Sequence, residues 1–218
     1  LKSLVIHTAD EAGEYEGPDY KFGWGLMNTE KAVGLISASQ INSNNIIENE
    51  LLNGDSMIYN VQFDGVNPIR LTLGFTDPPS EPIPGILNNR EPLLINDLDI
   101  RLINNQNSLI YFPYFLDPDS PESPAQLGDN IVDNIEQIYI NNPEGGDYTI
   151  QITHKGSLLT PQSYSLIITG LRLLEIQNLD IGDDEDLQNL ISHTPNITFN
   201  NYDSMGETQT HYHVQIST

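Results

Sequence analysis

Apolar and polar residues alternate in short stretches through the middle of the chain, and a period of two residues predicts β-strands. The alternation is clear from Met57 to Phe63 and again from Ile69 to Phe75. Further strands are expected near residues 46–51, 98–102, 109–115, 135–140, 148–152 and 164–168. Turn segments rich in Gly, Pro, Asn and Asp separate them, and no helical pattern intervenes. The pattern therefore predicts a mainly β fold over residues 42–172, an eight-stranded antiparallel jelly-roll sandwich.

The start of the chain follows a helical period instead. A helix is expected over residues 1–9, where one face carries Leu1, Leu4, Val5 and Thr8. A second short helix is expected over residues 29–39, with Asn28 placed to cap its N-terminus. Between the two helices lies a loop in which Gly23 and Gly25 allow backbone angles that other residues resist.

The composition changes again after the expected sandwich. Residues 173–192 contain the run DIGDDEDLQNL and are expected to form an acidic linker, because the run lacks the spacing of an EF-hand calcium loop. Residues 193–218 are expected to begin a further β-module. His211 and His213 fall on one face of a strand there, without a third ligand spaced to complete a zinc site. Because the chain starts inside an expected helix and stops inside an expected strand, both ends are expected to be cut from something longer.

The chain is strongly acidic, with 31 Asp and Glu against 8 Lys and Arg and a formal net charge of -23. Such a surface repels phosphate backbones and anionic lipid heads, which argues against nucleic acid and membrane surfaces as partners. No apolar run approaches the roughly 18 residues of a membrane-spanning helix, so no membrane span is expected. The chain has no cysteine, which excludes disulfides and thiolate zinc sites. Abundant oxygen donors suit a hard cation, and calcium is the expected cofactor.

The segment NDLDIRL at 96–102 is the centre of the expected calcium site. Strand alternation places Asp97 and Asp99 on one face, and two neighbouring carboxylates repel each other unless a cation lies between them. The further oxygen donors of the expected metal site are Asp77 from the preceding turn, or Asp129, Asp133, Asn134 and Glu136. The alternative is a solvated strand face on which Arg101 is the local counter-charge.

The stretch from Leu1 to Val33 contains a recognisable order of residues: His7, Thr8, Ala9, Gly17, Pro18, Asp19, Tyr20, Gly23, Trp24, Gly25, Asn28, Ala32 and Val33. In this order the stretch resembles the end of the catalytic domain of subtilisin-like serine proteases, the subtilases. The resemblance implies that residues 1–41 are the last two helices of a truncated α/β subtilase domain. It also implies that the nucleophile, in a G-T-S-M-A type sequence, lies about two dozen residues before this point. This chain contains no such sequence, so it lacks the Asp/His/Ser triad and should be inactive alone.

Residues 68–170 resemble the β-sandwich that follows the catalytic domain in certain bacterial subtilases and is related in architecture to the P-domain of proprotein convertases. The matching segments are LGFTDPP at 73–79, NDLDIRL at 96–102, GDNIVDNIEQIYI at 128–140, GDYTIQI at 146–152 and QSYSLIITG at 162–170. The end of the chain, from Thr194 to Thr218, resembles the early strands of a fibronectin type III-like module.

These resemblances imply a non-catalytic C-terminal region of a subtilisin-like serine endopeptidase, bacterial and either secreted or displayed at the cell surface. The sandwich would pack against its own protease catalytic domain and stabilise it, with calcium, while the parent enzyme acts on extracellular protein substrates. Two alternatives stay open. The sandwich could be a binding module that tethers the protease to a polysaccharide or protein substrate, with the aromatic run YFPYF at 111–115 as a platform. The parent could also be an inactive, protease-like surface protein.

Overall fold

The computed structural model describes residues 1–40, 42–82, 85, 87, 90–172, 177–180 and 198–200. The chain divides into two units, Leu1–Arg172 and Leu173–Thr218. In the second unit, strand β11 (Gln177–Asp180) pairs antiparallel with β12 (Thr198–Asn200). The expected acidic linker, the further β-module and its histidine pair lie largely or wholly outside the described residues and stay predictions.

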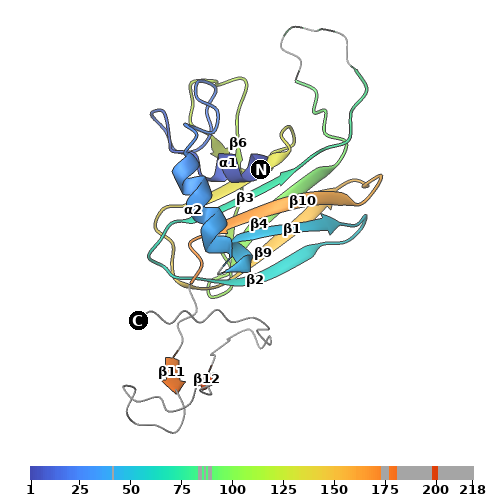
Figure 1. The fold of residues 1–218 in the computed structure, drawn as a ribbon. Coiled ribbons are helices and arrows are strands. Elements are labelled where there is room, and N and C mark those ends of the chain that lie inside the picture. Colours follow the sequence, from blue (N-terminus) through green and yellow to red (C-terminus); the bar gives the residue numbers. More distant parts are fainter. Residues whose placement is uncertain are drawn as a thin grey trace. The chain divides into compact units, whose positions relative to one another are not determined.

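The first unit is mainly β, as predicted, and its described residues form two four-stranded antiparallel sheets and two α-helices (Figure 1). The first sheet contains, in spatial order, β1 (Ile46–Leu51), β10 (Gln162–Thr169), β3 (Ile69–Phe75) and β8 (Ile135–Ile140). The second sheet contains β2 (Met57–Phe63), β9 (Gly146–Lys155), β4 (Asp97–Asn104) and β5 (Ile110–Tyr111). Because the chain passes back and forth between the sheets, each sheet joins segments that are far apart in the sequence.

One hydrophobic core lies between the two sheets. Leu71 and Leu73 of β3 enter it from the first sheet, and Ile100 and Leu102 of β4 enter it from the second. All four side chains are completely buried. The strand alternation read from the sequence is therefore confirmed for both strands, since the predicted apolar faces are the ones that the core contains.

The expected strand over residues 109–115 is wrong as a single element. It breaks at Pro113 into β5, which pairs with β4, and β6 (Tyr114–Phe115), which pairs with β7 (Gln126–Leu127) in a separate two-stranded sheet. Proline has no backbone N–H to donate to a neighbouring strand, so it ends the ladder. The Pro113 carbonyl accepts a hydrogen bond from the Gly128 N–H at 2.9 Å, which turns the chain toward β7.

Both predicted helices are present, as α1 (Lys2–His7) and α2 (Thr29–Ser39), and a 3-10 turn, η1 (Ser43–Asn45), leads into β1. The predicted N-cap of α2 is confirmed, because the Asn28 side chain accepts a hydrogen bond from the Lys31 N–H at 2.9 Å. Neither of these helices in the described part of the chain is long and apolar enough to cross a membrane.

The buried face of this segment agrees with the predicted one only in part. Leu4 and Thr8 are buried as predicted, Val5 is half-buried, and Ser3 and His7 are buried in addition. Leu1 is 92% exposed, because α1 lies on the outer face of β3 and β10 and that face meets the helix mainly with hydroxyl groups. Only Leu4 joins an apolar contact, a small second core that it forms with Leu35 of α2 and Ile167 of β10.

The loop between the helices turns at two glycines. Gly23 and Gly25 have φ angles of 60° and 100°, in the left-handed region where a Cβ is unfavourable. A Cβ on Gly25 would also lie 2.2 Å from the Asp10 carbonyl oxygen. Asp10 and Leu26 exchange two backbone hydrogen bonds of 2.8 Å at this point. The prediction that these glycines serve the backbone is therefore confirmed.

Candidate functional site

Three carboxylates converge on one ammonium group at the outer face of the second sheet. β4 carries Asp97 and Asp99 on the face opposite its core residues, and the strand register places Lys155 of β9 directly beside Asp97. The Lys155 Nζ lies 2.9 Å from Asp99 Oδ1, 3.4 Å from Asp129 Oδ2 and 3.6 Å from Asp97 Oδ2. We call this group, together with Arg101 and Glu136, the acidic cluster.

Arg101 holds the loop that carries Asp129 against β4. Its guanidinium contacts Asp129 Oδ1, lies 3.5 Å from Asp99 Oδ1, and donates to the Ile100 carbonyl oxygen at 2.7 Å. The same guanidinium lies over the Phe112 ring, 4.7 Å from its centroid. Arg101 is therefore fixed from several sides, as the counter-charge that one interpretation of the sequence assigned to it.

Glu136 reaches the acidic cluster from the other sheet. Its side chain belongs to β8, is completely buried, and accepts a hydrogen bond from the Ile100 N–H of β4 at 2.6 Å. Burial raises the pKa of this carboxyl to about 9. The negative charges of Asp99 and Asp97 also raise this pKa, whereas the hydrogen bond from Ile100 lowers it. Glu136 is therefore protonated at neutral pH when no further cation is near.

Several oxygens of this region are buried without a hydrogen-bond partner. Among the described residues, the buried side-chain atoms in this condition are Asn96 Oδ1, Asp97 Oδ1 and Glu136 Oε1. Burial also raises the pKa of Asp97, although the neighbouring Lys155 opposes that shift. Buried polar atoms normally have a partner, so unpartnered oxygens beside a group of carboxylates fit a site for a cation with oxygen ligands.

The other predicted calcium ligands do not belong to the acidic cluster. Both carboxylate oxygens of Asp77 accept backbone N–H groups, those of Ile95 and Asn96, at 2.8 Å each. Asn134 Oδ1 accepts from the Lys2 ammonium at 2.5 Å, and Asp133 is exposed. The structure thus brings together Asp97, Asp99, Asp129 and Glu136 from the predicted set.

Within the part of the chain that the structure describes, no group of three or more His, Cys, Asp or Glu side chains is arranged to hold a metal ion as it stands. In the acidic cluster, Lys155 and Arg101 contact the carboxylates. Calcium also uses amide, carbonyl and water oxygens, so this arrangement leaves the calcium prediction untested.

Sequence reasoning missed Lys155 and Asn96. Lys155 ends the alternating segment GDYTIQITHK, on the same face as Gln151 and Thr153, and only the register of β9 against β4 places it beside Asp97. The sequence offered one signal for Lys155: the chain has few basic residues, so a lysine on a predicted strand stands out.

A second set of buried polar contacts joins α1 to the outer face of the first sheet. His7 Nδ1 lies 2.9 Å from the Thr72 hydroxyl of β3, and its Nε2 lies 3.2 Å from the Thr169 hydroxyl of β10. The Ser3 and Ser165 hydroxyl oxygens are 2.7 Å apart. The helix is therefore fastened to two strands by side chains from both of its ends.

Arg70 of β3 closes the C-terminal end of α1. Its guanidinium donates to the carbonyl oxygens of His7 and Ala9, at 2.7 and 3.3 Å, where a positive charge also suits the helix dipole. Burial, helped by the charge of Arg70, lowers the pKa of His7 to about 3. His7 is therefore neutral at neutral pH and acts as a structural side chain.

The loop after α1 and the outward side of α2 expose a group of large apolar side chains. Its members are Phe22 (54% exposed), Leu26 (67%), Met27 (62%), Val33 (61%) and Ile36 (44%). We call this group the exposed apolar surface. These residues are close in sequence, and exposed apolar residues concentrated on one segment fit a surface that another part of a protein covers.

The aromatic run at 111–115 does not form a flat platform. Tyr114 is buried and packs against Gly17, and the Phe112 ring is covered on one side by Arg101. Tyr111 is half-buried on the short strand β5. The rings therefore face different surroundings instead of one open surface.

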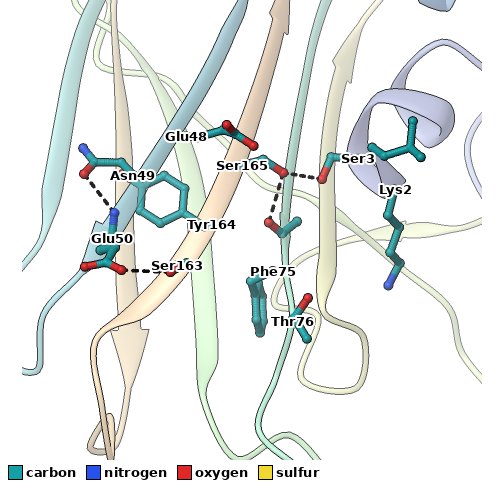
Figure 2. A pocket seen from close by; sticks show the side chains of 12 residues that line it. Lys2, Ser3, Glu48, Asn49, Glu50, Phe75, Thr76, Ser163, Tyr164 and Ser165 are labelled. Carbon is teal, nitrogen blue, oxygen red and sulfur yellow. Dashed lines mark hydrogen bonds between the residues drawn. The ribbon is translucent and has the colours of Figure 1, made fainter.

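A hollow of about 490 Å³ lies beside the start of α1, on the outer face of β1, β10 and β3 (Figure 2). Figure 2 shows the Ser165 hydroxyl beside that of Ser3, and the hydrogen bond from Ser163 to Glu50. The Ser163 Oγ lies 3.0 Å from Glu50 Oε1. The two aromatic side chains in its lining, Phe75 and Tyr164, are buried and offer little ring surface to a ligand. The hollow carries serine hydroxyls and carboxylates without the charge pairing of the acidic cluster.

A comparison of the sequence with models of known protein families found no match, and a comparison with curated proteins found none either.

Proposed function

We propose that this chain is a non-catalytic accessory region of a bacterial, secreted subtilisin-like serine endopeptidase. Its jelly-roll sandwich would hold the last two helices of the catalytic domain and so stabilise that domain. The observation that carries the proposal is the two-sided character of the helical segment: one side is fastened to the sandwich by buried polar groups, and the other is apolar and exposed.

The fastened side accounts for the stabilising role. His7, Ser3 and Arg70 connect α1 to β3 and β10, so unfolding of the sandwich would release the helix. The exposed apolar surface accounts for the partner. The resemblance of residues 1–33 implies that the remainder of a subtilase catalytic domain covers this surface. Burial of Phe22, Leu26 and Val33 against that domain would remove apolar area from water.

The strand order supports the sandwich part of the proposal. When the short β6 and β7 pair is left out and the eight other strands are counted along the chain, the first sheet has the order 1-8-3-6 and the second 2-7-4-5. Strands 1 and 8, 2 and 7, 3 and 6, and 4 and 5 are then antiparallel neighbours. This is the order that results when one long antiparallel ribbon wraps around itself, which is the description of a jelly roll.

Hydrogen exchange tests the docking part of the proposal. The exchange rates of amides in residues 20–36 are compared between the chain alone and the same chain joined to its catalytic domain. Slower exchange in residues 20–36 of the longer protein, with unchanged exchange in the core strand β9 as the control, is the expected result. Equal rates in residues 20–36 would mean that nothing covers the exposed apolar surface.

The chain alone is expected to have no peptidase activity, because the matching subtilase residues in it include no nucleophile. The full chain, purified from a host strain that lacks secreted proteases, is incubated with casein and with peptide substrates. Cleavage that a serine-protease inhibitor abolishes would contradict the proposal.

Calcium is the ligand that we propose for the acidic cluster. Asp97, Asp99, Asp129 and Glu136 would supply carboxylate oxygens of the kind that calcium binds, and water would complete the usual number of about six to eight ligands. Bound calcium would neutralise the cluster and link the two sheets through Glu136.

A ligand that binds only the folded state raises the free energy of unfolding, so the midpoint of thermal unfolding should rise with calcium concentration. The full chain is unfolded in EGTA and in 1 to roughly 10 mM calcium, with magnesium as the control ion. Identical midpoints in EGTA and in calcium would remove calcium from the proposed function and leave the docking role in place.

A further inference from the structure

The Lys155 ammonium occupies the point where the carboxylates of the acidic cluster meet. Asp97, Asp99 and Asp129 all lie within 3.6 Å of its Nζ, and they come from β4 and from the loop before β8. The ammonium hydrogen bond goes to Asp99, and Asp129 and Asp97 lie at ion-pair distance. Lys155 thus stands where a cation with oxygen ligands would be held.

Lys155 balances only part of the negative charge of the acidic cluster. Three carboxylates, those of Asp97, Asp99 and Asp129, face two basic side chains, Lys155 and Arg101, so negative charge remains in excess. Asp97 Oδ1 and Glu136 Oε1 also stay without a hydrogen-bond partner. The cluster therefore has the charge and the free oxygens for an ion of higher charge than an ammonium group.

The two basic side chains differ in how firmly they are held. Arg101 contacts the Phe112 ring and the Ile100 carbonyl oxygen as well as carboxylates. Lys155 is 37% exposed, and its ammonium hydrogen bond goes to Asp99. A flexible four-carbon stem lets a lysine at the end of a strand turn its charge into water. Lys155 is the group that an incoming cation can displace.

We propose that Lys155 is a built-in competitor for calcium at the acidic cluster, so that calcium binds by exchange with its ammonium group. The inference rests on the calcium part of the proposed function and adds its regulation. Lys155 partly neutralises the carboxylates when calcium is scarce, and the same contact weakens calcium binding, because the two cations repel each other at this distance. The cluster then needs a higher calcium concentration for half-saturation than it would need without Lys155.

Calcium titration of the full chain and two variants tests the exchange. Lys155→Met removes the competing charge. Lys21→Met is the matched control, because it also removes one lysine charge and one ion pair, but away from the acidic cluster. The ion pair that it removes is the exposed contact between Lys21 Nζ and Glu122 Oε2 at 2.7 Å. The dissociation constant is measured calorimetrically with calcium chloride in calcium-depleted buffer. Lys155→Met should bind calcium at least about tenfold more tightly than the unchanged chain, and Lys21→Met should not.

A second measurement needs no variant and covers the case in which Lys155→Met does not fold. The unchanged chain is acetylated for a short time in EGTA and in saturating calcium, and each lysine is quantified by mass spectrometry. Acetylation of Lys155 should rise several-fold in calcium, while Lys21 should be modified equally in both buffers.

The outcomes separate the two proposals. If the unchanged chain binds calcium as tightly as Lys155→Met, or if Lys155 is acetylated no faster in calcium, the exchange inference is overturned and the calcium site stands. If neither protein binds calcium, the calcium site and the exchange both fall. The docking role of the exposed apolar surface is tested by hydrogen exchange and is untouched by either result.

Discussion

His7 makes the stability of the chain depend on pH in a way that can be worked out from its surroundings. The imidazole is 2% exposed, lies between the hydroxyls of Thr72 and Thr169, and is close to the charge of Arg70. Burial, together with Arg70, lowers its pKa from 6.5 to about 3. The folded chain therefore keeps His7 neutral over a range in which the unfolded chain protonates it.

The sign follows from the protons that each state binds. Between about pH 6.5 and pH 3 the unfolded state binds one more proton at His7 than the folded state, so the free energy of unfolding falls as the pH falls. One pKa unit corresponds to about 1.4 kcal/mol. From pH 7.5 to pH 5 the loss due to His7 is then about 2 kcal/mol, and it is complete only below the folded pKa.

Urea unfolding at pH 7.5, 6 and 5 measures this loss, with the fluorescence of Trp24, the single tryptophan, as the probe of the first unit. His7→Gln is the comparison protein, because glutamine is neutral throughout and other titrating groups cancel in the difference. The stability advantage of the unchanged chain over His7→Gln should shrink by about 2 kcal/mol between pH 7.5 and pH 5. A difference that stays constant over this range would refute the neutral, buried state of His7.

Further predictions concern Glu136 and two glycines. In calcium-free buffer, the raised pKa of Glu136 means that the folded state keeps a proton that the unfolded state releases above about pH 4.5. The free energy of unfolding should therefore fall by about 1.4 kcal/mol per pH unit as the pH rises toward 9. Glu136→Gln should lack this alkaline slope in chemical unfolding, and an unchanged slope would contradict the buried, protonated carboxyl. Gly25→Ala should lower the free energy of unfolding by more than about 1 kcal/mol, because its φ is 100° and the new Cβ would meet the Asp10 carbonyl. Gly34→Ala, in α2 with no atom within 4 Å of the new Cβ, is the control and should stabilise the chain by about 0.5–1 kcal/mol; equal effects of the two changes on the melting midpoint would count against this assignment.

The strands were predictable because their pattern reflects burial directly. A strand in a two-sheet core must place every second side chain inside, and Leu71, Leu73, Ile100 and Leu102 obey that rule. The N-cap of α2 was predictable for a similar reason, since Asn28 acts on a backbone group only three residues away. Local chemistry and a fixed period are properties that a single sequence carries.

The acidic cluster was predictable only in part. The alternation of β4 gave Asp97 and Asp99, but Lys155 lies 56 residues from Asp99 and meets it through strand pairing. The buried face of α1 was predicted only in part, because the surface beneath it presents hydroxyls: the amphipathic rule selected Leu1, whereas Ser3 and His7 are buried. Contacts between distant segments depend on how two strands are aligned. The alternation within one strand does not predict its register against another strand.

The hydrogen bond from Ile100 to Glu136 closes an open margin of the second sheet. The Asn104 N–H donates to Leu109 at 2.9 Å, and since alternate N–H groups of a strand point the same way, the Ile100 N–H also faces the β5 side. Among the residues that the structure describes, β5 pairs with β4 at Leu102 and Ile103 and no strand lies beside Ile100 on this side, where a carboxyl from the opposite sheet takes that place. A strand from another molecule would find the Ile100 N–H already bonded to Glu136, so this part of the sheet margin offers one backbone donor fewer for edge-to-edge pairing.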